Sequence, residues 1–307
     1  MPCPPPSRSV LLAAGDLVLD VLIRPHGPLR RGTDTPGTVS VAGGGSASNV
    51  ACWVVFLGGV ARFVGAVGDD PAGAWLLEDL RRRGVDARVE VRAEQPTGVV
   101  AVWIEGDERT MVTCQGANRT LPAFLLAQET WEGVVHFHFT GYALVTDRWR
   151  VLGAKELART RGCTVSLDPA AYALVLEVVG HDGFRSACEG VDVLLPNRVE
   201  ALALSGATTL EEAAEALASL VPVVCIKDGS RGCIVATRRG LLRVPPEPTT
   251  VVDPTGAGDA FAAGFLLRWI QGADLEDAAR AGNRAGSEAV GKFGARPPLS
   301  PARRRVP

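Results

Sequence analysis

Short apolar segments alternate along the chain with longer segments in which apolar residues recur every three or four positions. The apolar segments are SVLLAAG, ARFVGAVG, GVVHFHF, CTVSLD, VDVLLPN and VPVVCIKDG. Runs such as VDVLL lack the alternation of a half-exposed strand, which is typical of strands that are buried on both faces. Segments such as AGAWLLEDLRRRG and TLEEAAEALASL have the helical spacing. This alternation predicts a doubly wound, mostly parallel α/β sheet that is flanked by helices.

Two stretches break this rhythm, at residues of about 17–41 and about 96–113, where strand-like pieces follow one another without a helix between them. They predict a small accessory sheet. Because no linker rich in Ser, Pro or Gly separates a second domain, we expect residues 1–307 to form a single α/β domain. The Pro-rich first six residues and the tail RPPLSPARRRVP, which begins at Arg296, are expected to be poorly ordered ends.

The segment VVDPTGAGDAFAAGFLL has both a helix pattern and a candidate for chemistry. Phe261, Phe265 and Trp269 recur at four-residue spacing, which predicts an amphipathic helix with one buried face that begins at the glycines. Its first N–H groups have no intrahelical partner and carry the positive end of the helix dipole, so a phosphate can bind there. Asp259 then stands beside the phosphate, although a cap or a partner of the dipole is the simpler interpretation.

Polar residues also follow the other predicted strands, at the edge where ligands bind in sheets of this kind. They are Gly15-Asp16 with Asp20, Pro196-Asn197-Arg198-Val199-Glu200, and Lys227-Asp228-Gly229. A further glycine run, Gly43-Gly44-Gly45, leads into a predicted helix with Asn49 in its first turn. Taken alone, each feature is more commonly a tight turn or a helix cap.

Composition and charge narrow the choice of partner. Lys and Arg number 32 against 34 Asp and Glu, a net charge of −2, which gives no electrostatic reason to expect nucleic acid or an anionic membrane surface as partner. We therefore expect a small molecule. The beginning of the chain lacks an apolar segment of signal-peptide length and no apolar run is long enough to cross a bilayer, so we expect a cytoplasmic protein. The seven cysteines form no C-x-x-C pair and are expected to be buried free thiols.

The motifs taken together resemble those of the ribokinase-like, or PfkB, carbohydrate kinases over nearly the whole chain. GGSASN at 44–49 resembles the N-terminal signature of that family, and DPTGAGDAFAAGF at 253–265 resembles its C-terminal signature. Shorter matches are GAN at 116–118, NRVE at 197–200, KDGSRG at 227–232 and KFGA at 292–295. The resemblance implies a ribokinase-like fold in which residues of about 17–41 and 96–113 form a small β-sheet lid.

The resemblance also implies a role for each motif. Asp259 is the implied general base, which takes the proton of an acceptor hydroxyl as that hydroxyl attacks the γ-phosphate of ATP. The implied anion hole for the phosphoryl group is Gly256, Ala257 and Gly258. The implied acceptor site is Asp20, Gly44, Gly45, Asn49 and Asn118. The implied ATP contacts are Asn197, Lys227, Gly229, Gly232 and Asn283.

Two ion sites follow from the same resemblance. Asn197 and Glu200 match the motif that binds Mg²⁺ through its waters, with helix capping as the alternative role. Asp253 and the backbone around Lys292 and Gly294 match a site for a monovalent cation such as K⁺, although Asp253 can also simply fix a turn. The run from Gly286 to Phe293 has the spacing of a phosphate loop. We reject it because Phe293 replaces the Ser or Thr that binds magnesium.

Departures from the ribokinase pattern bear on the acceptor. Val18 and Thr140-Gly141 stand where ribokinases have Asn and Glu, and Ser46 stands where ribokinases and phosphosugar kinases often have Lys. These departures count against ribose and against a phosphosugar. The prediction is an ATP- and Mg²⁺-dependent kinase that phosphorylates a sugar or sugar-like polyol. A nucleoside kinase of the same family and a catalytically silent ligand-binding protein remain alternatives, and we expect a homodimer formed through the lid.

Overall fold

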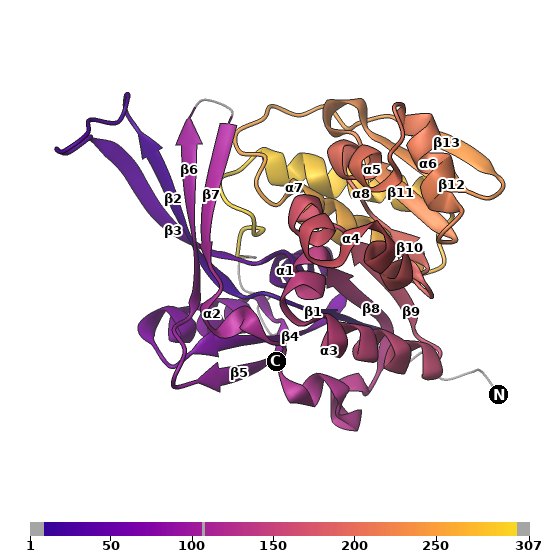
Figure 1. The fold of residues 1–307 in the computed structure, drawn as a ribbon, viewed down its shortest axis with the longest axis horizontal. Coiled ribbons are helices and arrows are strands. Elements are labelled where there is room, and N and C mark those ends of the chain that lie inside the picture. Colours follow the sequence, from indigo (N-terminus) through magenta and orange to yellow (C-terminus); the bar gives the residue numbers. More distant parts are fainter. Residues whose placement is uncertain (1–8, 106–107, 300–307) are drawn as a thin grey trace, which may run out of the picture.

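The large sheet of this computed structural model runs through the middle of the molecule (Figure 1). Within residues 9–105 and 108–299, which the structure describes, it has nine strands in the order β13-β12-β11-β10-β9-β8-β1-β4-β5. The strands are β1 (Val10–Ala14), β4 (Val60–Gly68), β5 (Asp86–Arg92), β8 (Val134–Thr140), β9 (Thr164–Asp168), β10 (Val193–Leu194), β11 (Val223–Lys227), β12 (Cys233–Thr237) and β13 (Gly240–Val244). All neighbours from β5 to β11 are parallel, whereas β12 and β13 add an antiparallel edge.

Helices cover both faces of this sheet (Figure 1). One face carries α1 (Ser46–Phe56), α2 (Pro71–Arg83), α7 (Ala257–Ile270) and α8 (Leu275–Val290). The other carries α3 (Gly141–Thr160), α4 (Tyr172–Cys188), α5 (Arg198–Ser205) and α6 (Leu210–Ala218). Short 3₁₀ turns connect some of these elements: η1 (Gly116–Arg119), η2 (Ala123–Leu126), η3 (Gln128–Trp131) and η4 (Gly229–Arg231). The large sheet has a hydrophobic core on each face, and β1 contributes to both. Its side chains alternate, so Leu11 and Ala13 pack on the α1 side and Leu12 and Ala14 on the α3 side.

Helix α7 differs from its prediction. The spacing of its aromatic residues predicts one buried face, but residues 260–266 are all buried. The reason is that α7 packs between α1 and α8. Gly264 shows how close this packing is, since a Cβ built on it would lie 2.6 Å from the carbonyl oxygen of Ala281 in α8. The prediction that the helix begins at the glycines is confirmed, with Gly256 as its N-cap.

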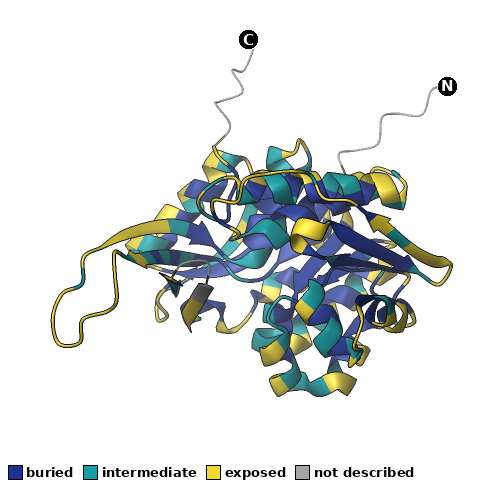
Figure 2. Ribbon diagram, turned by 90° about the horizontal axis from the view of Figure 1, so that it is seen from above, coloured by how far each residue is buried: buried dark blue, intermediate teal, exposed yellow. Residues whose placement is uncertain are grey.

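A second, small sheet projects from the large one (Figure 1). Its strands are β2 (Val18–Pro25), β3 (Gly37–Gly44), β6 (Gly98–Glu105) and β7 (Glu108–Cys114), in the order β3-β2-β6-β7. The β2–β6 pair is parallel and the other pairs are antiparallel. Figure 2 shows that the strands are buried near the large sheet and exposed toward the far end. The accessory sheet that the two strand-rich stretches predict is therefore present.

The ends of the chain and the cysteines bring two corrections. The first six residues and residues 300–307 lie outside the described part, but Arg296, at the start of the predicted tail, is only 8% exposed. The prediction of a poorly ordered tail is wrong there, because Arg296 is hydrogen-bonded inside the molecule. Among the described cysteines Cys114 is exposed, and the other five are buried free thiols as predicted. No helix in the described ranges has the length and apolarity needed to span a membrane.

Candidate active site

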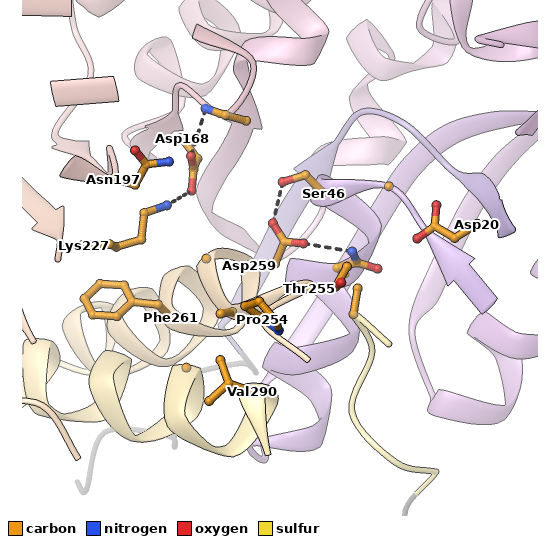
Figure 3. A pocket seen from close by; sticks show the side chains of 18 of the residues that line it. Asp20, Ser46, Asp168, Asn197, Lys227, Pro254, Thr255, Asp259, Phe261 and Val290 are labelled. Carbon is orange, nitrogen blue, oxygen red and sulfur yellow. Dashed lines mark hydrogen bonds and ion pairs between the residues drawn. The ribbon is translucent and has the colours of Figure 1, made fainter. Parts of the chain in front are cut away.

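A cavity of about 1270 Å³ lies at the carboxyl ends of the parallel strands. Its lining extends from Asp20 and Val102 of the small sheet, past the first turns of α1 and α7, to Asn283 of α8. Figure 3 shows the labelled side chains in that order, with Lys227 and Asn197 at one side, Asp259 in the middle and Asp20 at the other side. The strand ends therefore bring together the polar residues that the sequence places after separate strands.

Asp259 lies at the centre of this cavity, in the first turn of α7 (Figure 3). Ser46 Oγ donates to its Oδ1 at 2.7 Å and Asn49 Nδ2 donates to its Oδ2 at 2.8 Å. Burial raises the pKa of Asp259 to about 6, although both hydrogen bonds favour the charged form. The group is a carboxylate at neutral pH with a pKa near the working range of a general base.

The backbone beside Asp259 is open to an anion. Gly256 has φ 74°, and a Cβ on it would lie 2.5 Å from the Cα of Ala295, so both the conformation and the space require glycine. Gly258 and Asp259 occupy the first turn of α7, where N–H groups have no partner within the helix. Residues 256–258 line the cavity, as expected for the predicted anion hole.

An ion pair lies next to this helix start. Lys227 Nζ and Asp168 Oδ2 are 2.6 Å apart, and their side chains are 12% and 5% exposed. Burial lowers the pKa of Lys227, but the carboxylates of Asp168 and Glu200 outweigh it and raise the pKa overall. The sequence interpretation missed Asp168, although it closes the apolar run CTVSLD and its position after a strand was the available signal.

Asn197 and Glu200 form a capping box at the start of α5. Asn197 Oδ1 accepts from the backbone N–H of Glu200 at 3.0 Å, and Glu200 Oε2 accepts from the N–H of Asn197 at 2.7 Å. The alternative role of helix capping is thus observed. Both residues nevertheless also line the cavity, and burial raises the pKa of Glu200 to about 7, with the charge of Asp168 adding to the rise.

These residues fit a magnesium ion only in part. In the described ranges no group of three or more His, Cys, Asp and Glu side chains is placed to hold a metal ion. A divalent ion held by Asn197 and Glu200 would therefore need most of its ligands from phosphate oxygens and waters, which is how Mg²⁺ commonly binds beside nucleotides.

The predicted acceptor site is built around Asp20. This residue is 8% exposed, and burial raises its pKa to about 6. Its carboxylate lies over Gly44, where an added Cβ would come within 2.3 Å of Oδ1, and Gly45 has φ 97°. Asn118 lines the cavity too, but its Oδ1 accepts from the N–H of Leu17 at 3.0 Å and its Nδ2 donates to the carbonyl of Leu17 at 3.0 Å. Its contact with an acceptor stays a prediction.

Arg296 is a residue that the sequence interpretation missed entirely. It donates to Asp79 Oδ2 at 2.6 Å, to the carbonyl of Gly44 at 3.0 Å, to Ser48 Oγ at 2.8 Å and to Asn49 Oδ1 at 3.2 Å. Because Asn49 accepts from Arg296 through Oδ1, its Nδ2 is the atom that faces Asp259. Arg296 thus fixes the orientation of this amide from behind the glycine turn.

The predicted nucleotide contacts lie at the opposite end of the cavity. Gly229 and Gly232 have φ 57° and 84°, and a Cβ on Gly232 would lie 2.1 Å from the carbonyl oxygen of Val244. Asn283 Nδ2 donates to the carbonyl of Pro245 at 2.8 Å, which ties α8 to the chain after β13. All three predicted residues line the cavity.

The candidate cation loop is held by Asp253. Its Oδ1 accepts from the N–H of Thr255 at 2.9 Å and its Oδ2 from the N–H of Gly294 at 2.9 Å, so the role of fixing the turn is observed. The side chain of Lys292 pairs with Glu288 at 2.6 Å on the surface. The run from Gly286 begins inside α8, in agreement with the rejection of a phosphate loop there.

Comparison with known proteins agrees with this geometry. The model of the pfkB family carbohydrate kinases matches residues 11–303. The ATP-dependent ribose-1-phosphate kinase of Halopiger xanaduensis is 32% identical, with 93% of each chain covered. The ribokinase of Staphylococcus aureus is 28% identical over 82% of this chain and 83% of its own.

Two solved structures are also similar. The adenosine kinase from Sinorhizobium meliloti has a TM-score of 0.83 and 27% identity, with 94% of this chain and 96% of that chain covered. The fructokinase from Vibrio cholerae, in a form with bound fructose, ADP and calcium ion, has a TM-score of 0.78 and 26% identity, with 95% and 96% covered. The ribokinase-like fold is thus confirmed, and so is a phosphotransferase with a hydroxyl group as acceptor. The chain belongs to the PfkB family of carbohydrate kinases.

Proposed function

We propose that this protein is an ATP-dependent kinase that transfers the γ-phosphate to a hydroxyl of a sugar or sugar-like polyol. The observation that carries the proposal is the position of Asp259. Its carboxylate lies beside the first turn of α7, between Asp20 at the acceptor end and Lys227 at the nucleotide end (Figure 3). A hydroxyl between Asp20 and Asp259 therefore has a base on one side and an anion site next to it.

In the proposed reaction Asp259 takes the proton of the acceptor hydroxyl while that oxygen attacks the γ-phosphorus of ATP. The O–P bond to the acceptor forms, the bond from phosphorus to the β-phosphate oxygen breaks, and ADP leaves. The N–H groups at 256–258 receive the charge of the transferring phosphoryl group. Asn197 and Glu200 would hold Mg²⁺ through its waters, and the ion would supply further positive charge to the phosphates.

A nucleoside acceptor is the second candidate, and the inner face of the small sheet favours it. Val18, Val100, Val102 and Met111 line the cavity above Asp20. An apolar surface of this kind suits a nucleobase better than a small polyol, which presents hydroxyls on all sides. The similar structure from Sinorhizobium meliloti is an adenosine kinase. A catalytically silent binding protein has no such observation in its favour.

We propose that the small sheet, formed by residues of about 17–41 and 96–113, is a lid and is also the surface through which a homodimer forms. Its outer face is apolar, since Val21 pairs with Val41 and Ala101 with Val112 in register. Val41 and Val112 are 57% and 71% exposed. A second copy of this face can cover them through a two-fold contact, and sedimentation equilibrium decides whether it does.

A monovalent cation is proposed at the loop of Asp253, with the backbone around Lys292 and Gly294. The carboxylate of Asp253 fixes this loop next to Gly256 of the anion site, and carbonyl oxygens there can bind K⁺. Equal rates in K⁺ and in a bulky ammonium salt would count against this site.

The test of the main proposal is ADP release with a panel of sugars, polyols and nucleosides. For the best acceptor, Asp259→Asn is expected to lower turnover at least about a hundredfold while MgATP still binds, because a general base contributes about 10²–10⁴-fold. Asp277→Asn is the matched control, since Asp277 is also the third residue of its helix but lies exposed on α8. If the two variants were equally active, Asp259 would not be the general base and would only interact with the dipole of α7.

A further inference from the structure

Lys227 brings a positive charge that is largely shielded from solvent to the start of α7. A Cβ built on Gly258 would lie 3.3 Å from Lys227 Nζ, so the ammonium group sits directly against the first turn of the helix. Figure 3 shows the side chain directed from the end of β11 toward Asp168, with Asn197 beside it. The main chain of Lys227 is held in place, because its N–H donates to the carbonyl of Pro196 at 2.8 Å.

The surroundings of this ammonium are acidic. Asp168 pairs with it at 2.6 Å, and the charges of Glu200 and Asp259 also act on it. Among the described residues that line the cavity, the other Lys or Arg is Arg119, which is exposed in η1. Lys227, with its side chain 12% exposed, is therefore the more enclosed of these two cations, and it lies against the first turn of α7, where residues 256–258 line the same cavity.

We propose that Lys227 is a catalytic residue that binds the transferring phosphoryl group, and that Asp168 is the positioning residue that holds its ammonium in place. This inference rests on the proposed kinase function. It differs from a general nucleotide-binding role for Lys227, because the ammonium lies against the first turn of α7, where the transferring phosphoryl group is proposed to bind. Lys227 keeps its proton throughout and donates hydrogen bonds to a γ-phosphate oxygen. These hydrogen bonds stabilise the negative charge on the phosphoryl group while the bond to ADP breaks.

The pairing with Asp168 has a chemical reason. Without a partner on the far side, a cation this close to Asp259 would pair with that carboxylate and make it a weaker base. Asp168 holds Nζ on the β9 side, which leaves the oxygens of Asp259 to Ser46 and Asn49. The acceptor hydroxyl can then give its proton to Asp259 while the phosphoryl group contacts Lys227.

The test uses Lys227→Met with Lys155→Met as the matched control. Lys155 is also a buried lysine, 4% exposed, but it donates to the carbonyl of Glu189 at 2.6 Å, away from the cavity. We expect Lys227→Met to lower kcat by about 10²–10³-fold, the usual effect of losing one donor to a developing anion. Its affinity for MgATP should fall about tenfold while that for MgADP stays unchanged, because the γ-phosphate is the group it contacts. Added methylamine should partly restore kcat.

Asp168→Asn tests the positioning role. Loss of its negative charge, together with a freed ammonium, lowers the pKa of Asp259. The acidic limb of the rate profile should therefore move to lower pH, which a purely structural change would not cause.

Each outcome decides something. If Lys227→Met weakens MgATP and MgADP equally and keeps kcat, Lys227 is a nucleotide contact and the proposal fails. If its kcat falls no further than that of Lys155→Met, the lysine is structural and the proposal fails as well. If the wild type phosphorylates no acceptor, the proposed function fails instead. The contact can still be tested by binding, because the wild type should prefer MgATP to MgADP more strongly than Lys227→Met does.

Discussion

Ser46 and Asn49 tune the carboxylate of Asp259 by occupying one oxygen each. Burial raises the pKa of Asp259 to about 6, and these two hydrogen bonds act in the opposite direction. The ordinary pKa of an Asp is lower, so protonation of Asp259 is favoured by folding. Its contribution to stability therefore increases as pH falls through about 6. The proposed activity has the opposite dependence, because Asp259 can act as a base only when it is ionised.

Ser46→Ala should for this reason raise the pKa of Asp259 further and move the acidic limb of log kcat to higher pH. A rate profile between about pH 5 and pH 8 with a saturating acceptor measures the shift. Ser205→Ala is the control, since Ser205 Oγ donates to the carbonyl of Ala201 in α5 and touches no group of the site. A limb that stays in place in Ser46→Ala would mean that another group controls the rate.

The residues of the site differ in how far the sequence reveals them. Asp259, Lys227 and Glu200 stand in recognisable motifs or directly after apolar runs, which is why they could be predicted. Asp168 has the same signal after β9 but no glycine or motif beside it. Arg296 has no local signal at all, because it lies in a Pro-rich stretch and its partners, such as Asn49, are more than 200 positions away in the chain.

At the scale of elements, Arg296 joins the segment after α8 to α1 and α2. Its guanidinium bonds to Asp79 in α2 and to Ser48 in α1, and its own side chain is 4% exposed. Because all these groups are buried, the cluster fixes the positions of α1, α2 and the segment after α8 relative to one another. The glycine turn before α1 is held by the same contacts through the carbonyl of Gly44.

Arg296→Met should lower the free energy of unfolding by roughly 3 kcal/mol, because Asp79 keeps only Arg83 as its cation and the carbonyl of Gly44 loses its buried donor. Urea unfolding followed by circular dichroism measures this change. Arg280→Met is the control, since Arg280 pairs with Glu276 on the surface of α8 and such exposed pairs contribute about 0–1 kcal/mol. Equal midpoints for both variants would show that the cluster around Arg296 contributes no more than a surface pair.

Elements were easier to predict than their packing. The strand runs and the helix starts at Ser46 and Ala257 follow from hydrophobic pattern and glycine placement. The full burial of α7 does not, because Ala and Gly residues between its aromatics carry little amphipathic signal, and only their contact with α8 shows their purpose. The short β10 is likewise set by its neighbours β9 and β11, since only two residues of its apolar run pair with them.

On the scale of the whole molecule, the small sheet forms one wall of the cavity. Its inner face contributes Asp20, Val100 and Val102, while the rest of the cavity belongs to the large sheet and its helices. The core of the small sheet is minor, with Leu22, Val102 and Ile104 as its buried apolar residues. An element with so little buried contact is expected to open and close at low cost, which is what a lid requires.

Binding of an acceptor should therefore slow hydrogen exchange across residues 17–41 and 96–113, because the acceptor fills the space under the inner face of the sheet. Asp20→Ala should remove most of this protection and raise the acceptor KM strongly, with MgATP affinity nearly unchanged, since Asp20 lies at the end of the cavity away from Asn283. The matched variant is Asp34→Ala, in the exposed turn between β2 and β3, which should retain both protection and KM.

If Asp20→Ala weakened MgATP binding as much as acceptor binding, Asp20 would have no specific role in acceptor binding. If exchange stayed unchanged in the wild type with a true substrate, the small sheet would be a fixed wall. Closure of the proposed lid over the γ-phosphate would also exclude water, so opening the lid by mutation should raise ATP hydrolysis relative to transfer.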